Sequence, residues 1–159
     1  MKLAVEKLAD IVAKDWMRVA KLLADHWQEI VPDKELMKLD VNTEKYFEAD
    51  AAERLHIVVM RDDNGIIIGY SVHFLTDHPH YKRLRCAEDD VHYLVPEERQ
   101  TGAHKLMRAF ALKTLKERGV KFVTARVKIA TDHHRVLRQL GYVPIDTVYG
   151  LDLTNWAEE

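Results

Sequence analysis

Two segments rich in isoleucine and valine, residues 55–61 and 66–75, are separated by the polar stretch Asp62-Asp63-Asn64-Gly65. Asn-Gly supplies the positive φ angles that the tight turns between antiparallel strands require. The two segments are therefore predicted to form a β-hairpin, and the chain must contain a sheet with antiparallel strands.

Two long segments show helical spacing of their apolar residues. The first starts at Ile11 and recurs every three or four residues, which predicts a helix that Pro32 ends. Residues 103–118 show the same spacing with Gly119 just beyond, which predicts a second amphipathic helix. Shorter helices are expected over residues 43–52 and 131–140.

The remaining predicted strands are residues 3–8, 91–95, 121–128 and 142–153. A helix that starts early fits residues 3–8 almost as well as a strand does. The polar, histidine-rich residues 76–88 are expected to be a connection, and Pro96 stops the strand that follows it. The resulting order, β, α, α, β, β, β, α, β, α, β, predicts an α/β (α+β) chain in which helices cover a mixed sheet.

The composition is that of one globular domain. The chain has 159 residues, of which 47% are hydrophobic, and no linker or repeat marks a boundary, so residues 1–159 are expected to form a single domain.

The 24 Lys and Arg against 26 Asp and Glu give a net charge of −2, which argues against nucleic-acid binding. No apolar stretch suits a membrane span or a signal peptide, so a cytoplasmic protein without a membrane partner is expected.

Residues 96–107 join the end of a predicted strand to the start of an amphipathic helix. Backbone N–H groups at a helix start point outward and favour an anion, so a diphosphate fits there. Gly102 lets a ligand approach the backbone closely, and Arg99 adds a positive charge beside it. The stretch has neither the Gly-Lys-Ser/Thr of a Walker loop nor Gly-x-Gly-x-x-Gly.

The hexapeptide Arg99-Gln100-Thr101-Gly102-Ala103-His104 resembles the signature Arg/Gln-x-x-Gly-x-Gly/Ala of the GNAT superfamily of acyl-CoA-dependent N-acetyltransferases. Leu94-Val95-Pro96 is similar to the family's strand end, and Leu140-Gly141-Tyr142 is similar to its Leu-Gly-Phe/Tyr. A narrower similarity, to small GNAT-domain proteins of phages and bacteria, is carried by His26-Trp27-Gln28-Glu29-Ile30, His78-Pro79-His80-Tyr81 and Asp90-Val91-His92-Tyr93-Leu94.

The resemblance implies a GNAT-like fold, with a mostly antiparallel twisted sheet of six to seven strands, about four helices and a splay between strands 4 and 5. It also implies acetyl-CoA (coenzyme A) as co-substrate. The main chain of Leu94 and Val95 would pair with the pantetheine arm, and Arg99 would lie beside the diphosphate. The N–H groups that would hold the diphosphate are those of Gln100, Thr101, Gly102, Ala103 and His104.

His104 departs from the family signature, which has Gly or Ala at this position. Its imidazole either points away from the cofactor or donates a hydrogen bond to a phosphate. An altered or lost cofactor site is the alternative.

Acetyl transfer to an amine needs a base that removes a proton from the ammonium. The resemblance favours Asp90, and the alternation of a strand would place it on one face with His92 and Leu94. Asp89 and Glu88 are competing candidates, and three solvated acids at a strand start are the alternative interpretation.

Two further parts of the chemistry follow from the resemblance. A backbone N–H near Leu94 would donate a hydrogen bond to the carbonyl oxygen of the acetyl group as that oxygen gains negative charge. Leu137 stands where many family members have the tyrosine that protonates the leaving thiolate, so no general acid is assigned.

By the same resemblance His26, Trp27, His80 and Tyr81 would line the acceptor side, although Trp27 also fits the apolar stripe of the first long helix. Nine histidines raise the alternative of a metal protein. No HExxH motif or Cys-His pair is present, so no metal is expected.

The sequence therefore predicts an acetyl-CoA-dependent N-acetyltransferase that acts on a primary amine of a small molecule or a protein, by direct attack in a ternary complex. A catalytically inactive GNAT-fold protein that binds acyl-CoA or a partner is the alternative. The resemblance also implies a homodimer, and a phage-encoded protein would work in the host cytoplasm.

Overall fold

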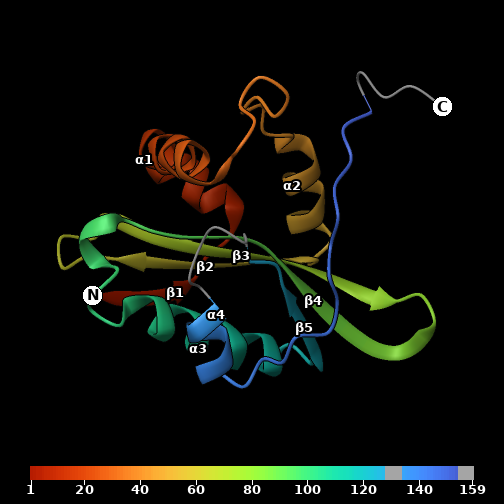
Figure 1. Cartoon of the computed structure of the whole chain (residues 1–159). Helices are drawn as coiled ribbons and strands as arrows, with labels where there is room; N and C mark the ends of the chain where they lie inside the picture. The colour runs from red at the N-terminus through yellow and green to blue at the C-terminus, as the bar shows by residue number, and fades with distance from the viewer. Residues whose placement is uncertain (128–133, 154–159) are drawn as a thin grey trace.

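The protein is described by a computed structural model over residues 1–127 and 134–153, which contain one five-stranded sheet (Figure 1). The strands lie in the order β1-β2-β3-β4-β5, and every pair is antiparallel except β4–β5, which is parallel. The strands are β1 Lys2–Val5, β2 Leu55–Arg61, β3 Ile67–His78, β4 Tyr81–Leu94 and β5 Phe122–Ala125. The helices are α1 Leu8–Ile30, α2 Thr43–Ala51, the short 3-10 helix η1 Pro96–Glu98, α3 Ala103–Glu117 and α4 His134–Gln139. The predicted α/β class with a mixed sheet is confirmed.

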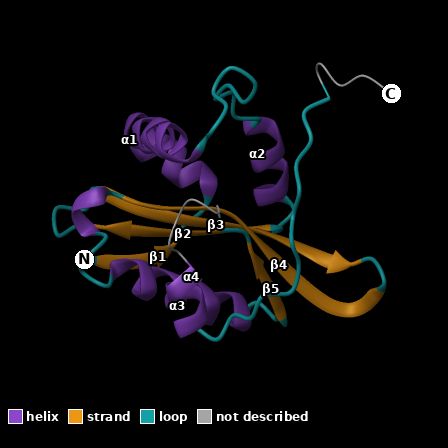
Figure 2. Cartoon of the chain, viewed as in Figure 1, coloured by secondary structure: helices purple, strands orange, loops and turns teal. Residues whose placement is uncertain are grey.

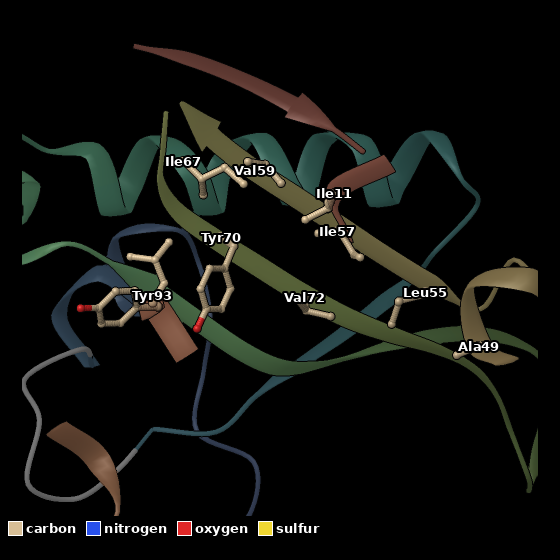
Figure 3. Close-up of a cluster of buried hydrophobic side chains, with 10 residues drawn as sticks. Ile11, Ala49, Leu55, Ile57, Val59, Ile67, Tyr70, Val72 and Tyr93 are labelled. Carbon is tan, nitrogen blue, oxygen red and sulfur yellow. The ribbon is translucent and has the colours of Figure 1, made fainter. Parts of the chain in front are cut away.

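Helices cover both faces of this sheet. α1 and α2 lie on one face, and α3 lies on the other, where Figure 1 also draws α4. On the α1 side, Ile57, Tyr70 and Tyr93 belong to the cluster of buried side chains in Figure 3. On the α3 side, Leu94 packs in a cluster with Met107. Because both faces are covered, β2 is buried at nearly every position and does not alternate between buried and exposed residues.

The β2–β3 hairpin forms as its turn chemistry predicts. The side chain of Asp62 accepts hydrogen bonds from the N–H groups of Asn64, at 2.9 Å, and Ile66, at 2.8 Å. Gly65 has a φ of 84°, which a residue with a Cβ adopts only under strain. The turn therefore fixes the register of the two central strands.

The two helices on one face begin and end close to the predicted positions. Residues 2–5 form a strand, so the early-helix alternative is wrong, and α1 begins at Leu8. At its end the N–H of Val31 donates to the Trp27 carbonyl at 3.2 Å, and Pro32, which has no N–H, follows. Asn42 caps α2 by accepting the N–H of Lys45 at 3.1 Å.

The expected connection over residues 76–88 is wrong. β3 continues to His78 and β4 starts at Tyr81, so these residues form the outer part of a long hairpin. The first three residues of β4 are exposed. Polar residues there reflect a hairpin end that projects beyond the covering helices, not an absence of strand pairing.

The predicted strand over residues 142–153 is also wrong. Figure 2 shows this segment as loop, and the described residues form five strands where six to seven were expected. Val148 and Tyr149 are 70% and 90% exposed. Apolar alternation marks the propensity to form a strand, but a strand also needs an edge to pair with. Within the described chain no segment pairs with the outer edge of β5.

None of the helices in the described ranges is both long and apolar enough to cross a lipid bilayer.

Candidate functional site

A bulge in β4 organises the site. β3 pairs Val72 with Val91 and the adjacent His73 with Asp89, so Asp90 has no partner on β3. An extra residue of this kind interrupts the alternation of side chains and increases the local twist. Val91 packs against the apolar cluster on the α1 side. The carboxylate of Asp90 lies on the same side, because its Oδ2 accepts a hydrogen bond from the Tyr46 hydroxyl of α2 at 2.5 Å.

The predicted common face of Asp90, His92 and Leu94 is therefore wrong. The His92 Nε2 atom lies 2.9 Å from Nδ1 of His104, which is on α3. Leu94 belongs to the buried cluster that contains Met107 of α3. The bulge leaves His92 and Leu94 facing α3 while it turns Asp90 toward α2, a reversal that strict alternation cannot predict.

The three candidate acids differ in their partners. Asp89 is 7% exposed and accepts a hydrogen bond from Arg108 of α3, with 2.7 Å between Arg108 Nη1 and Asp89 Oδ2. The carboxylate of Glu88 pairs with Arg126 at 2.5 Å. Asp89 is thus the buried counterion of Arg108, whereas Asp90, like Glu88, lies on the α1–α2 side, and Asp90 has access to solvent there.

The environment of Asp90 suits a base. Partial burial raises the pKa of its carboxyl above the ordinary value, and the hydrogen bond from Tyr46 opposes that rise. Burial also raises the pKa of the Tyr46 phenol, so Tyr46 stays protonated and donates at neutral pH. A carboxylate with a raised pKa accepts a proton more readily than a fully solvated one.

The sheet opens where the bulge occurs. β5 pairs with β4 only over residues 86–89 and 122–125, while β4 continues to Leu94. We call the point where the two strands separate the fork. Beyond it, residues 90–94 have no strand partner on the β5 side within the described chain. The predicted splay between strands 4 and 5 is present at this point.

The main chain past the fork directs the N–H of Leu94 to the open side. Val95 donates its N–H to the Ile68 carbonyl at 2.9 Å, toward β3. Successive residues of a paired strand direct their N–H groups to opposite edges, so that of Leu94 points toward the fork. Leu94 therefore fits the predicted contact with a pantetheine arm, whereas the N–H of Val95 is already used.

The start of α3, which we call the cradle, has the open space that a bound diphosphate needs. Gly102 has a φ of 83°, and a Cβ built on it would meet nothing within 4 Å. Thr101 donates its N–H to the Glu98 carbonyl at 3.3 Å, and the N–H of Ala103 is 3.4 Å from the Thr101 hydroxyl. Within the described residues, the N–H groups of Gln100 and Gly102 donate to no acceptor. A helix start also presents N–H groups that have no carbonyl partner within the helix.

The side chain of Arg99 already has hydrogen-bond partners on neighbouring elements. Its Nε donates to the Leu94 carbonyl at 2.8 Å, and its Nη2 contacts both carboxylate oxygens of Glu29 at 2.8 and 2.9 Å. The guanidinium carbon also lies 5.4 Å from the centroid of the Tyr93 ring. Arg99 therefore holds the loop to α1 and β4, and its charge is partly neutralised by Glu29.

The imidazole of His104 points away from the start of α3. It lies against His92 on the sheet, with the rings tilted and their centroids 5.1 Å apart. The side chain points beneath α3, so the bulky residue does not fill the cradle at the helix start.

The four predicted acceptor-side residues do not come together. His26 of α1 stacks on Tyr93 with 5.0 Å between ring centroids, and Trp27 donates its indole N–H to the Met37 carbonyl at 2.7 Å. His80 and Tyr81 lie at the tip of the β3–β4 hairpin, roughly 40 Å of strand length from Tyr93. The hairpin, predicted as a loop, carries them away from α1.

A pocket lies between α1, α2 and the sheet, and His26 and Trp27 of the predicted acceptor-side residues line it. We call it the α1–α2 pocket, and its volume is about 690 Å³. It is lined by Trp16, Trp27, Tyr46, Phe47 and Tyr70, together with aliphatic side chains of α1 and of strands β2 to β4. Its lining comes from segments far apart in the chain, which is why no single motif marks it.

The histidines do not form a metal site in the described ranges, where no group of three or more His, Cys, Asp and Glu side chains converges.

The sequence matches no known family model and no curated protein, but the structure is similar to many solved ones. A ribosomal-protein-alanine N-acetyltransferase from Brucella melitensis biovar Abortus 2308 has a TM-score of 0.69 and 16% identity over 96% of this chain and 100% of its own. An aminoglycoside acetyltransferase from an uncultured soil metagenomic sample has a TM-score of 0.70 and 14% identity over 96% of this chain and 95% of its own. Glucosamine-6-phosphate N-acetyltransferase from Arabidopsis thaliana has a TM-score of 0.68 and 12% identity over 96% of this chain and 99% of its own.

These structures share this architecture along nearly their whole length. Through its structure, the chain is identified as having the fold of the GNAT superfamily of N-acetyltransferases.

Proposed function

We propose that the protein is a single-domain N-acetyltransferase that moves the acetyl group of acetyl-CoA to a primary amine by direct attack in a ternary complex. The observation that carries this proposal is the coincidence of bulge and fork. Asp90, the residue that bulges, is the first residue of β4 beyond its pairing with β5. Its carboxylate faces the α1–α2 pocket side, and the open strand edge starts at the same point.

The residues present fit acetyl-CoA. Gly102 with its positive φ and the open N–H groups around it form the place for the diphosphate. The N–H of Leu94 faces the fork, where a pantetheine amide would pair with it. When bound, acetyl-CoA supplies an acetyl group activated as a thioester.

The residues of this chain then have defined tasks. Asp90 accepts a proton from the substrate ammonium, which leaves the amine nitrogen neutral and nucleophilic. The nitrogen forms a bond to the acetyl carbon as the bond to sulfur breaks. A backbone N–H of the open β4 edge other than that of Leu94, which the pantetheine amide would occupy, would donate to the carbonyl oxygen while that oxygen gains charge. Leu137, at the family's tyrosine position, is buried and has no proton to give to the departing sulfur.

Two measurements test the proposal. Acetyl-CoA at about 100 times its Kd should stabilise the protein by about 2.7 kcal/mol, a rise in Tm of roughly 5–10 °C, while ATP gives a much smaller rise. Thiol release with a panel of amines then measures turnover. Asp90→Asn should keep the acetyl-CoA shift and lower kcat at least 100-fold, whereas Asp77→Asn, an exposed acid of β3, should change neither.

The outcomes separate the two predicted functions. No stabilisation by acetyl-CoA contradicts the cofactor site, and full activity of Asp90→Asn contradicts the base. Tight acetyl-CoA binding with no turnover on any amine supports the inactive acyl-CoA-binding alternative, which the buried Leu137 favours.

A further inference from the structure

We propose that the acceptor is an amine with an apolar body, an arylalkylamine or a long-chain alkylamine, bound with its body in the α1–α2 pocket and its ammonium at Asp90. This inference rests on the proposed acetyltransferase function and assigns the substrate class of that site.

The size of the pocket suits a small organic molecule. Its volume is about 690 Å³, and pockets for such ligands range from roughly 300 to 1,000 Å³. Trp16, Leu39 and Phe47 line it and are 45%, 43% and 41% exposed. Large apolar side chains are thus exposed where the pocket meets solvent, so an apolar ligand would contact them on its way in.

The lining selects against polar acceptors. Of the described lining residues, four other than the tyrosines carry polar side chains, namely His26, Asp40, Asn42 and Thr43, and none is Lys or Arg. A sugar or aminoglycoside would lose water from several hydroxyls without enough partners to replace it. A sugar phosphate would find no Lys or Arg among these described lining residues. An apolar body, by contrast, gains from leaving water.

The polar end of the pocket is placed for one ammonium. Tyr46 and Val91 line the pocket, and Asp90 is hydrogen-bonded to the first and adjacent in sequence to the second. Asp40 is the one carboxylate among the described lining residues, and it is exposed on the connection between α1 and α2. A polyamine would have to place its further charges among apolar side chains, so a single amine on an apolar body fits best.

Calorimetry in the presence of saturating coenzyme A, which carries no acetyl group, measures acceptor binding without turnover. The probes are 2-phenylethylamine and octylamine, with spermidine and glucosamine as polar comparisons. We expect both apolar amines to bind at least tenfold more tightly than either comparison. Equal or tighter binding of spermidine or glucosamine, or no binding of the apolar amines, overturns the inference.

A matched pair of variants tests the location. Val12 lines the pocket from α1, whereas Met17 on the same helix is 82% exposed and outside the lining. Val12→Trp should fill the pocket and weaken 2-phenylethylamine binding at least tenfold, and Met17→Trp should leave it unchanged. An unchanged affinity in Val12→Trp, or an equal loss in both, overturns the location.

Phe47→Lys provides a second test, because the residue is exposed at the pocket and tolerates a polar replacement without loss of the core. It places a cation where the apolar body would bind, so 2-phenylethylamine binding should weaken at least fivefold. The Tm of each variant, measured without ligand, checks that it is folded. An unchanged affinity in folded Phe47→Lys counts against the pocket.

The binding of acetyl-CoA to the wild type is measured separately and distinguishes the two proposals. If acetyl-CoA binds and is turned over, but polar amines are the preferred acceptors, only the substrate class is overturned. If acetyl-CoA does not bind, the proposed function fails, and the role of the pocket as an acceptor site fails with it.

Discussion

Tyr46 and Asp90 are 44 positions apart in the chain, yet their hydrogen bond sets the protonation of the candidate base. The bond favours the carboxylate and so holds down a pKa that burial raises. Tyr46→Phe removes it, and the pKa of Asp90 should rise further. The acidic limb of the pH profile of kcat/KM should therefore move to higher pH by about one unit.

The control for this prediction is Tyr81→Phe, at the exposed tip of the β3–β4 hairpin, which should leave the profile in place. An acidic limb that stays fixed in Tyr46→Phe would mean that another group limits the reaction. The profile separates this positioning role from a loss of packing, which would lower the rate at every pH.

At this scale the sequence suggested a candidate acid but not where it points. The resemblance favoured Asp90 as the base, which stays a prediction, and the structure places Asp90 on the α1–α2 side. Its face was wrong because a bulge depends on the register with β3. Tyr46 was missed because nothing local connects a residue of α2 with a residue of β4.

Arg99 and Glu29 join two elements, the last turn of α1 and the loop that follows β4. Arg99→Glu puts two carboxylates in contact, so the free energy of unfolding should fall by about 1 kcal/mol, or roughly 2–4 °C in Tm. The double variant Glu29→Arg with Arg99→Glu restores an opposite-charge pair and should recover most of the loss. Thermal unfolding at low and high salt measures both.

If the double variant is no more stable than Arg99→Glu alone, the charge pair does not hold the loop. In that case the contacts of the guanidinium with the Leu94 carbonyl and the Tyr93 ring carry its effect.

Most elements could be predicted from the sequence because their signals are local. Asp62 and Gly65 make the hairpin turn, and Pro32 follows the last hydrogen bond of α1. The two errors, residues 76–88 and 142–153, concern pairing. A polar strand is stable when a neighbouring strand holds it, and an apolar segment is no strand where it has no edge to pair with.

The whole molecule should lose stability in mild acid because of a histidine between the sheet and α3. His56 is 1% exposed, its Nε2 lies 2.9 Å from the Thr114 hydroxyl, and its Nδ1 lies 3.3 Å from Arg118 Nη1. Arg118 can only donate, so His56 is neutral with its proton on Nε2. Burial, together with the nearby His73 and Arg118, lowers the pKa of His56 to about 4.

A histidine whose pKa is lower in the folded state binds its proton more readily when the chain is unfolded. Its contribution to stability is complete above the unfolded pKa of about 6.5 and is lost as the pH falls toward 4. Between pH 7 and pH 4.5 the loss should be on the order of 2–3 kcal/mol. Urea unfolding of the wild type and of His56→Gln measures the difference, and the variant should show the shallower pH dependence. Equal slopes for the two proteins would contradict this assignment.

The sequence by itself determined the parts of this protein whose cause lies within a few residues: the turn at Asn64-Gly65, the long helices, and the glycine-dependent helix start at Gly102. Tertiary structure alone decided the face on which Asp90 lies, its hydrogen bond with Tyr46 and the α1–α2 pocket. The physical reason is that these features depend on register and packing between segments far apart in the chain. A shift of one residue in β4 exchanges its two faces, and no local preference in the sequence fixes that shift.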